Sequence, residues 1–387
     1  MDIQPFKIAI SDASIDDLKQ RLARTRWLET IDCLGWREGT DAAFLKRLVS
    51  YWQHTFDWRR QETKLNQLPQ FTAQIDQQRV HFVHQKGCGP APMPLVLTHG
   101  WPGSFVEMAE IVPMLADPAR YGGDPYDAFD VVVPSLPGYG FSSAPTQTGI
   151  GSAQTADYWA KLMRGLGYEK FAAQGGDIGA GVSSWLARNY PERIIGVHLN
   201  FIPGSYRPYL GEGATPVCAE EQDFLDKVSA WAASEGAYGH QQGTRPQSLA
   251  VGLNDSPAGL AAWITEKFQA WSDCHGDLEQ GIGLDALLTD ISVYWFTQSI
   301  GSSFRMYVEG RAMPLSFSQG QHVQPPLGVA LFPAELPMPP RSWVERSFSV
   351  QRWTTMSRGG HFAALEYPED LAKEIRDFFR PLRENAR

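Results

Sequence analysis

Apolar residues recur every three or four positions near the start of the chain, which is the spacing of one helix face. Ile15, Leu18 and Leu22 follow Ser11, a suitable helix cap, and predict a helix over 11–25. A similar pattern predicts a second helix over 42–55. No catalytic pattern accompanies these helices. We therefore expect residues 1–70 to form a helical arm that wraps a later domain, or alternatively an oligomer contact.

Short apolar runs then alternate with helical patterns. The predicted strands, beginning with a hairpin, are 72–75, 80–83, 95–98, 130–133, 171–174, 194–199, 327–332 and 348–352. The predicted helices among them are 105–115, 153–166 and 368–382. This alternation predicts an α/β fold in which helices cover both faces of a mostly parallel sheet.

The pattern from residue 207 to residue 306 is helical and aromatic, without a convincing strand. It predicts a helical lid inserted between the two parts of the sheet domain, residues 71–206 and 307–387. Aromatic residues in this lid indicate a bulky apolar pocket. The candidate substrate-binding residues are Trp231, Trp263, Trp271 and Phe304.

Charge and cysteine content narrow the class of partner. A net charge of -9 without a basic cluster argues against nucleic acid or an anionic membrane surface. Neither a signal-peptide pattern nor a run of eighteen apolar residues is present, so we expect a soluble cytoplasmic protein. The cysteines have neither Cys-x-x-Cys nor metal-ligand spacing, so we expect free thiols, no disulfide and no metal: Cys33, Cys88, Cys218 and Cys274.

The first candidate for chemistry lies between a predicted strand and a predicted helix. There the sequence reads Gly175-Gly176-Asp177-Ile178-Gly179. A residue flanked by glycines in this setting occupies the place of the nucleophile elbow in α/β hydrolases. Because a carboxylate is ionised at neutral pH, Asp177 could attack a strained carbon directly and form an ester. A helix cap is the competing interpretation.

Two further residues follow later strands. Glu335 comes after the strand 327–332, and Gly359-Gly360-His361 follows the last strand. The order nucleophile, acid, base is that of the α/β hydrolases. Glu335 could accept the Nδ1–H of His361 while the ring takes a proton from water. Taken alone, a Glu or a His in a loop is more often a solvated surface residue.

The turn from His99 to Gly103 supplies a possible oxyanion hole. Its glycines and proline constrain a loop whose Trp101 N–H, together with the N–H of Ile178, would face the nucleophile. A turn required only by strand-helix geometry is the alternative.

Four motifs together resemble those of epoxide hydrolases of the microsomal type. They are His99-Gly100-Trp101-Pro102-Gly103, Gly175-Gly176-Asp177-Ile178-Gly179, Phe332-Pro333-Ala334-Glu335-Leu336 and Gly359-Gly360-His361-Phe362-Ala363-Ala364. The helical arm matches as well, so the resemblance covers nearly the whole chain. It implies an α/β-hydrolase fold with Asp177 as nucleophile, Glu335 as acid and His361 as base. It also implies that two lid tyrosines, Tyr238 and Tyr307, hold the epoxide oxygen.

The resemblance implies that a small apolar epoxide and water become a vicinal diol through an Asp177 ester, without metal or organic cofactor. The membrane anchor of microsomal members has no counterpart here. A haloalkane dehalogenase shares the Asp nucleophile, but Ile178 provides no indole N–H for a halide. A ligand-binding protein with a vestigial site is an alternative of another class. A homodimer is the default expectation, and detoxification, catabolism and biosynthesis are all open as roles.

Overall fold

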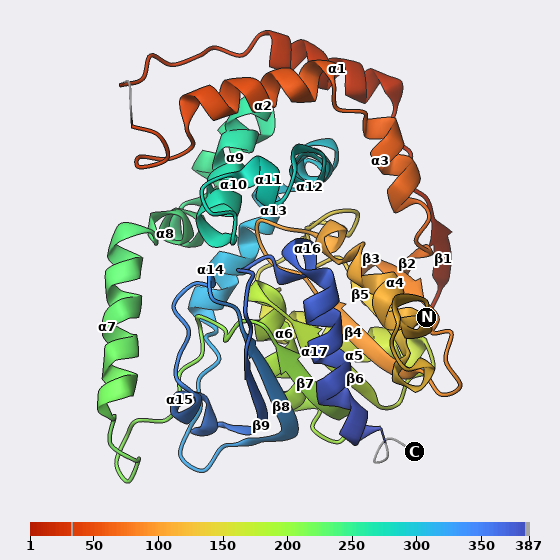
Figure 1. Cartoon of the computed structure of the whole chain (residues 1–387), viewed down its shortest axis with the longest axis vertical. Coiled ribbons are helices and arrows are strands. Elements are labelled where there is room, and N and C mark those ends of the chain that lie inside the picture. The colour runs from red at the N-terminus through yellow and green to blue at the C-terminus, as the bar shows by residue number, and fades with distance from the viewer. Residues whose placement is uncertain (32–33, 384–387) are drawn as a thin grey trace.

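The computed structural model describes residues 1–31 and 34–383, so Cys33 lies outside the described residues. Within them one nine-stranded sheet has the order β1-β2-β3-β5-β4-β6-β7-β8-β9 (Figure 1). The strands are β1 (Ile3–Phe6), β2 (Gln70–Ile75), β3 (Gln78–Gln85), β4 (Met93–Thr98), β5 (Phe129–Pro134), β6 (Phe171–Gly175), β7 (Ile194–Leu199), β8 (Val323–Leu331) and β9 (Phe348–Thr355). The pairs β1-β2, β2-β3 and β3-β5 are antiparallel, and every later pair in the order is parallel.

The central strands are buried along their whole length, as parallel strands covered on both faces are. The helices of the sheet domain are α4 (Ile111–Ala116), α5 (Ser152–Gly165), α6 (Asp177–Asn189), α15 (Arg341–Glu345), α16 (Ala363–Glu366) and α17 (Pro368–Phe379). Helix α5 packs on α6, and α4 packs on α17. The predicted α/β architecture with a mostly parallel sheet is confirmed.

The helix predicted over 105–115 is wrong as a single element. A 3-10 turn, η1, spans Phe105–Met108, and α4 begins afresh at Ile111. Pro113 explains the break, because it has no N–H to donate to the carbonyl of Ala109 in a continuous helix. Proline is tolerated in a first helical turn, where the N–H groups lack helical partners anyway.

The N-terminal arm contains three helices, α1 (Asp12–Ala23), α2 (Ala42–His54) and α3 (Trp58–Leu65), after the edge strand β1. The sequence patterns missed β1 and α3, each of which is short. The arm lies across the helical segment above the sheet (Figure 1). Trp52 Nε1 donates to Ser292 Oγ at 3.0 Å, and Tyr51 donates to Asp285 Oδ1 at 2.9 Å. The arm therefore braces the helices that follow β7.

Those helices run between β7 and β8. They are α7 (Ala219–Ser234), α8 (Ala237–Thr244), α9 (Pro246–Asp255), α10 (Pro257–Trp271), α11 (Leu278–Gly281), α12 (Leu284–Thr297), α13 (Ile300–Ser303) and α14 (Arg305–Ala312). We call this segment the lid; its helices continue past residue 306. Helix α7 stands at its outer edge (Figure 1), and Glu221 is its one buried residue. Among the described residues, no helix combines the length and apolar character needed to cross a membrane.

Candidate active site

Asp177 lies at the sharp turn where β6 becomes α6. It is the first residue of α6 and has a φ of 47°, a conformation uncommon outside glycine. The turn tolerates little bulk, because a Cβ on Gly179 would lie 1.9 Å from the carbonyl oxygen of Thr98 at the end of β4. The N-cap of α6 is Gly176, without a side-chain hydrogen bond. The helix-cap interpretation of Asp177 is therefore wrong.

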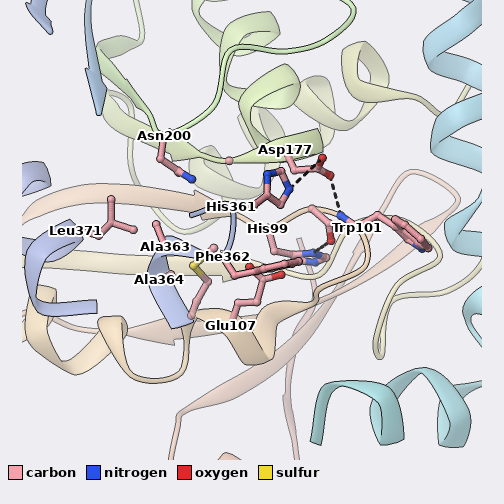
Figure 2. A pocket seen from close by; sticks show the side chains of 13 residues that line it. His99, Trp101, Glu107, Asp177, Asn200, His361, Phe362, Ala363, Ala364 and Leu371 are labelled. Carbon is pink, nitrogen blue, oxygen red and sulfur yellow. Dashed lines mark hydrogen bonds and ion pairs between the residues drawn. The ribbon is translucent and has the colours of Figure 1, made fainter. Parts of the chain in front are cut away.

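The structure brings the three triad candidates together from separate strand ends (Figure 2 shows His361 beside Asp177). Nδ1 of His361 lies 2.6 Å from Glu335 Oε1, and Nε2 lies 3.5 Å from Asp177 Oδ2. Glu335 follows β8, and its Oε1 also accepts the N–H of Leu336. Its Oε2 has no hydrogen-bond partner among the described residues. The buried carboxylate thus directs its charge at the imidazole.

Opposing effects set the protonation of His361. Burial disfavours the imidazolium, but the charge of Glu335 and the hydrogen bond to Asp177 outweigh burial and raise the pKa of His361 well above its usual value. In the free site the ring therefore sits as a cation between two carboxylates. Loss of the Asp177 charge on ester formation would lower this pKa and make the ring a base.

Backbone N–H groups approach the other side of the Asp177 carboxylate. Trp101 N donates to Asp177 Oδ1 at 2.8 Å (Figure 2). Gly100 next to it has no room for a side chain, since a Cβ there would lie 2.3 Å from the same oxygen. Ile178 is the second residue of α6, where helix N–H groups lack helical partners and favour negative charge. The loop around Trp101 and the start of α6 thus present N–H groups that could stabilise an oxyanion on Asp177.

Aromatic rings from the lid cover the site. Tyr238 on α8 stacks on Trp101 with ring centroids 5.4 Å apart, and Tyr307 on α14 meets Trp101 edge-on at 5.8 Å. The rings of Tyr238 and Tyr307 are 5.9 Å apart. Burial first, and the nearby Asp177 charge as well, raise the pKa of both phenols. Both hydroxyls are therefore protonated donors at neutral pH.

The other aromatic candidates lie at different depths. Phe304 is fully buried with its ring 6.2 Å from Trp101, and the ring of Trp271 lies 5.1 Å from His361. Trp263 is half-buried and donates to Gln242 Oε1 at 2.9 Å. Trp231 is on the outer helix α7. The structure thus places Phe304 and Trp271 beside the site, whereas no such ring contact with the site links Trp263 or Trp231 among the described residues.

A small cavity of about 20 Å³ adjoins the triad, and its lining includes two polar residues that the sequence analysis missed. Glu107 and Asn200 line it together with Asp177 and His361 (Figure 2). Burial, with the neighbouring Asp290 as a second cause, raises the pKa of Glu107 well above its usual value. Asn200 directly follows β7, a strand-end position that could have flagged it, whereas nothing local distinguishes Glu107.

A nucleophile on a strand-turn-helix elbow, with its base and acid at later strand ends, defines an α/β hydrolase. A family model described as "alpha/beta hydrolase fold" matches residues 93–205. The model "Epoxide hydrolase N terminus" matches residues 3–108. A protein of Stigmatella aurantiaca that carries an epoxide hydrolase name is 44% identical over 98% of this chain and 86% of its own length. The chain belongs to the epoxide hydrolase family.

Other relatives agree over nearly the full chain. Epoxide hydrolase 1 of Oryctolagus cuniculus is 39% identical over 97% of this chain and 88% of its own length. The solved structure of Aspergillus niger epoxide hydrolase has a TM-score of 0.86 at 32% identity, covering 99% of this chain and 97% of that one. The arm, the sheet domain and the lid are thus all shared with these relatives.

Proposed function

We propose that this chain converts a small apolar epoxide and water to a vicinal diol through an ester on Asp177. The observation that carries the proposal is the environment of that carboxylate. One oxygen accepts the N–H of Trp101, the other faces His361, and half-buried phenols cover the site from the lid. An ionised nucleophile opposite neutral donors is what opening a strained ring requires.

In the first step Asp177 Oδ2 attacks one ring carbon and the bond from that carbon to the epoxide oxygen breaks. The oxygen takes a proton from Tyr238 or Tyr307, which leaves a phenolate. Both hydroxyls suit this role because burial holds them in the protonated form. The product of the step is a neutral hydroxyalkyl ester. Because Asp177 has lost its charge, the pKa of His361 falls and the imidazolium gives its proton to the phenolate, which leaves the ring neutral.

In the second step His361 takes a proton from water, and the resulting hydroxide attacks the carboxyl carbon of Asp177. Oδ1 becomes the oxyanion, held by the N–H groups of Trp101 and Ile178. The bond to the alkyl oxygen then breaks, and that oxygen takes the proton from His361. The proton left on the Asp177 carboxyl group then passes to His361, which restores the ionised nucleophile and the imidazolium, so the sum is epoxide plus water to diol.

The cavity beside His361 is the place we assign to the hydrolytic water. Its volume of about 20 Å³ has room for about one molecule. Glu107 and Asn200 supply polar partners on its wall. Glu335 stabilises the imidazolium once the water has given up its proton.

The setting we propose is the cytoplasm, since Cys88 and Cys218 are exposed free thiols that suit a reducing compartment. Phe304 and Trp271, whose rings lie beside Trp101 and His361, would line the substrate site, and we assign Trp263 and Trp231 to its lid side. No metal or organic cofactor enters either step. We take a homodimer as the assembly and detoxification of reactive epoxides as the role.

A single turnover of excess enzyme with styrene oxide in oxygen-18 water tests the ester. The expected result is label in the peptide that contains Asp177 and an unlabelled first diol, because water attacks the carboxyl carbon. Label in the diol alone would mean direct attack by water and would overturn the mechanism. Asp177→Asn is the matched control and should form no ester.

Absence of diol would be followed by two further probes. Halide release from a haloalkane would favour a dehalogenase, which shares the nucleophile. Binding of styrene oxide without any product would favour a ligand-binding protein on a hydrolase fold. Either result would refute epoxide hydrolysis as the function.

A further inference from the structure

Lys267 is a buried lysine on the core face of the lid helix α10. Only 5% of its surface is exposed, and Ile264 and Trp271, one turn before and after it, are buried as well. Burying an ammonium is costly unless another group compensates for the lost water. A purely structural position of this kind would be filled more cheaply by leucine or methionine. The buried ammonium of Lys267 therefore indicates a role beyond packing.

The ammonium has two kinds of neighbour. Nζ lies 2.5 Å from Oε2 of Glu266, a partly exposed residue with 22% of its side-chain surface accessible. Nζ also lies 4.6 Å from the ring centroid of Tyr238 and 5.8 Å from that of Trp271. A cation this close to the face of an aromatic ring is attracted by its negative quadrupole, most strongly where water is excluded.

From this arrangement we infer that Lys267 is a positioning residue for Tyr238. Its ammonium holds the phenol ring in its stack on Trp101 and stabilises the negative charge that reaches the phenol when the epoxide opens. The inference deepens the proposed function and rests on it, because the phenol gains charge only if it donates to an epoxide oxygen. Lys267 itself touches no reacting atom in this scheme.

The charges around Tyr238 explain why a cation is useful. Burial, and then the Asp177 charge, disfavour the phenolate, and Glu266 and Glu335 add to this effect. During ester formation the Asp177 charge disappears while charge builds up on the phenol. Lys267 therefore assists the first step. In the second step the new charge develops on Asp177 Oδ1, beside Trp101 N, so Lys267 should matter little there.

The test separates the two steps in single turnovers of styrene oxide, followed by rapid quench and mass spectrometry of the Asp177 peptide. We expect Lys267→Met, which nearly conserves volume, to slow ester formation by about tenfold or more and to leave ester hydrolysis within about twofold. Lys267→Arg should restore most of the rate. Lys227→Met, on the exposed face of α7, is the matched control with no effect on either step.

A double-mutant cycle asks whether the effect passes through Tyr238. In a Tyr238→Phe background, Lys267→Met should cause no further slowing of ester formation. Equal slowing in both backgrounds, or equal losses in both steps, would overturn the inference and leave Lys267 as a packing residue. Thermal unfolding of each variant identifies loss of fold.

Glu266→Gln provides an independent test if Lys267→Met does not fold. Glu266→Gln leaves the ammonium without its partner carboxylate, so ester formation should be equal to or faster than wild type. If the pair is merely structural, the variant will instead slow both steps equally, which overturns the inference; a lower unfolding temperature is expected in either case, because the buried ammonium has lost its partner. Failure of the wild-type protein to form any diol would refute the proposed function itself and this role with it.

Discussion

Glu335→Gln should separate the two chemical steps, because it removes one buried charge and nearly preserves shape. The carboxylate lies 2.6 Å from His361 Nδ1, and its second oxygen has no partner among the described residues. Glutamine can still accept a hydrogen bond through its amide oxygen. What it cannot do is balance the charge of the imidazolium that forms when water is deprotonated.

The magnitude follows from the geometry of this pair. With charge centres about 4 Å apart and an effective dielectric constant of about 20, the interaction is about 4 kcal/mol. In the ester Asp177 is neutral, so Glu335 is the counter-charge that faces the ring directly. Loss of about 4 kcal/mol corresponds to about a 1000-fold slower ester hydrolysis. Ester formation uses Asp177 and the phenols, and should slow by less than about tenfold.

The assay is a rapid-quench time course in which mass spectrometry follows the Asp177 peptide. In the variant, ester should accumulate to nearly one per active site, with a burst followed by very slow diol release. Glu335→Asp is the control that keeps the charge and shifts its position. Equal slowing of both steps, or a variant that never accumulates ester, would refute the charge-balancing role.

Further substitutions test the site and its support. Asp177→Asn should abolish the ester and lower the pKa of His361, seen as imidazole signals that titrate at lower pH by NMR, because the hydrogen bond and charge that raise that pKa are lost. Gly179→Ala should cost about 3 kcal/mol in urea unfolding or prevent folding, because its Cβ would lie 1.9 Å from a carbonyl oxygen. Gly252→Ala in α9, with open space around it, should instead stabilise by up to about 1 kcal/mol. Burial raises the pKa of Asp290 to about 7, so the native state keeps a proton that the unfolded chain releases near pH 4. The free energy of unfolding of the wild type should therefore fall by up to about 4 kcal/mol through this group between pH 4 and 7. Asp290→Asn should lack this loss, so parallel curves of stability against pH for the two proteins would contradict the prediction.

The sequence was most informative where chemistry and backbone geometry constrain neighbouring residues together. The tight contact of α6 with β4 requires glycines around Asp177, and these glycines are visible in the local sequence. Glu335 and His361 could be found because each lies in the loop that follows a strand, and the carboxyl ends of parallel strands meet at one edge. These residues lie far apart along the chain, yet the fold class alone predicts that they meet.

Residues whose importance depends on packing between the lid and the sheet domain left weaker signals. Glu107 sits in an apolar run, and only the fold places its carboxyl group on the cavity beside His361. The surroundings of Lys267 likewise become clear only from the fold. Its position one turn before the buried Trp271, on an apolar helix face, was nevertheless unusual for a lysine. A charge on the apolar face of a helix is thus worth testing for a partner before it is assigned to solvent.

The chemistry divides between the two structural parts of the molecule. The proposed nucleophile, base and oxyanion donors lie beyond strand ends, in loops or at the start of α6, and the sheet holds them in register. The phenols and Lys267 lie on lid helices, whose position depends on the arm through contacts such as Trp52 to Ser292. In the proposed mechanism ester formation needs both parts, whereas ester hydrolysis uses groups of the sheet domain. If the proposed mechanism holds, we therefore expect the arm to affect the first step, by holding the lid that carries the phenols over Asp177.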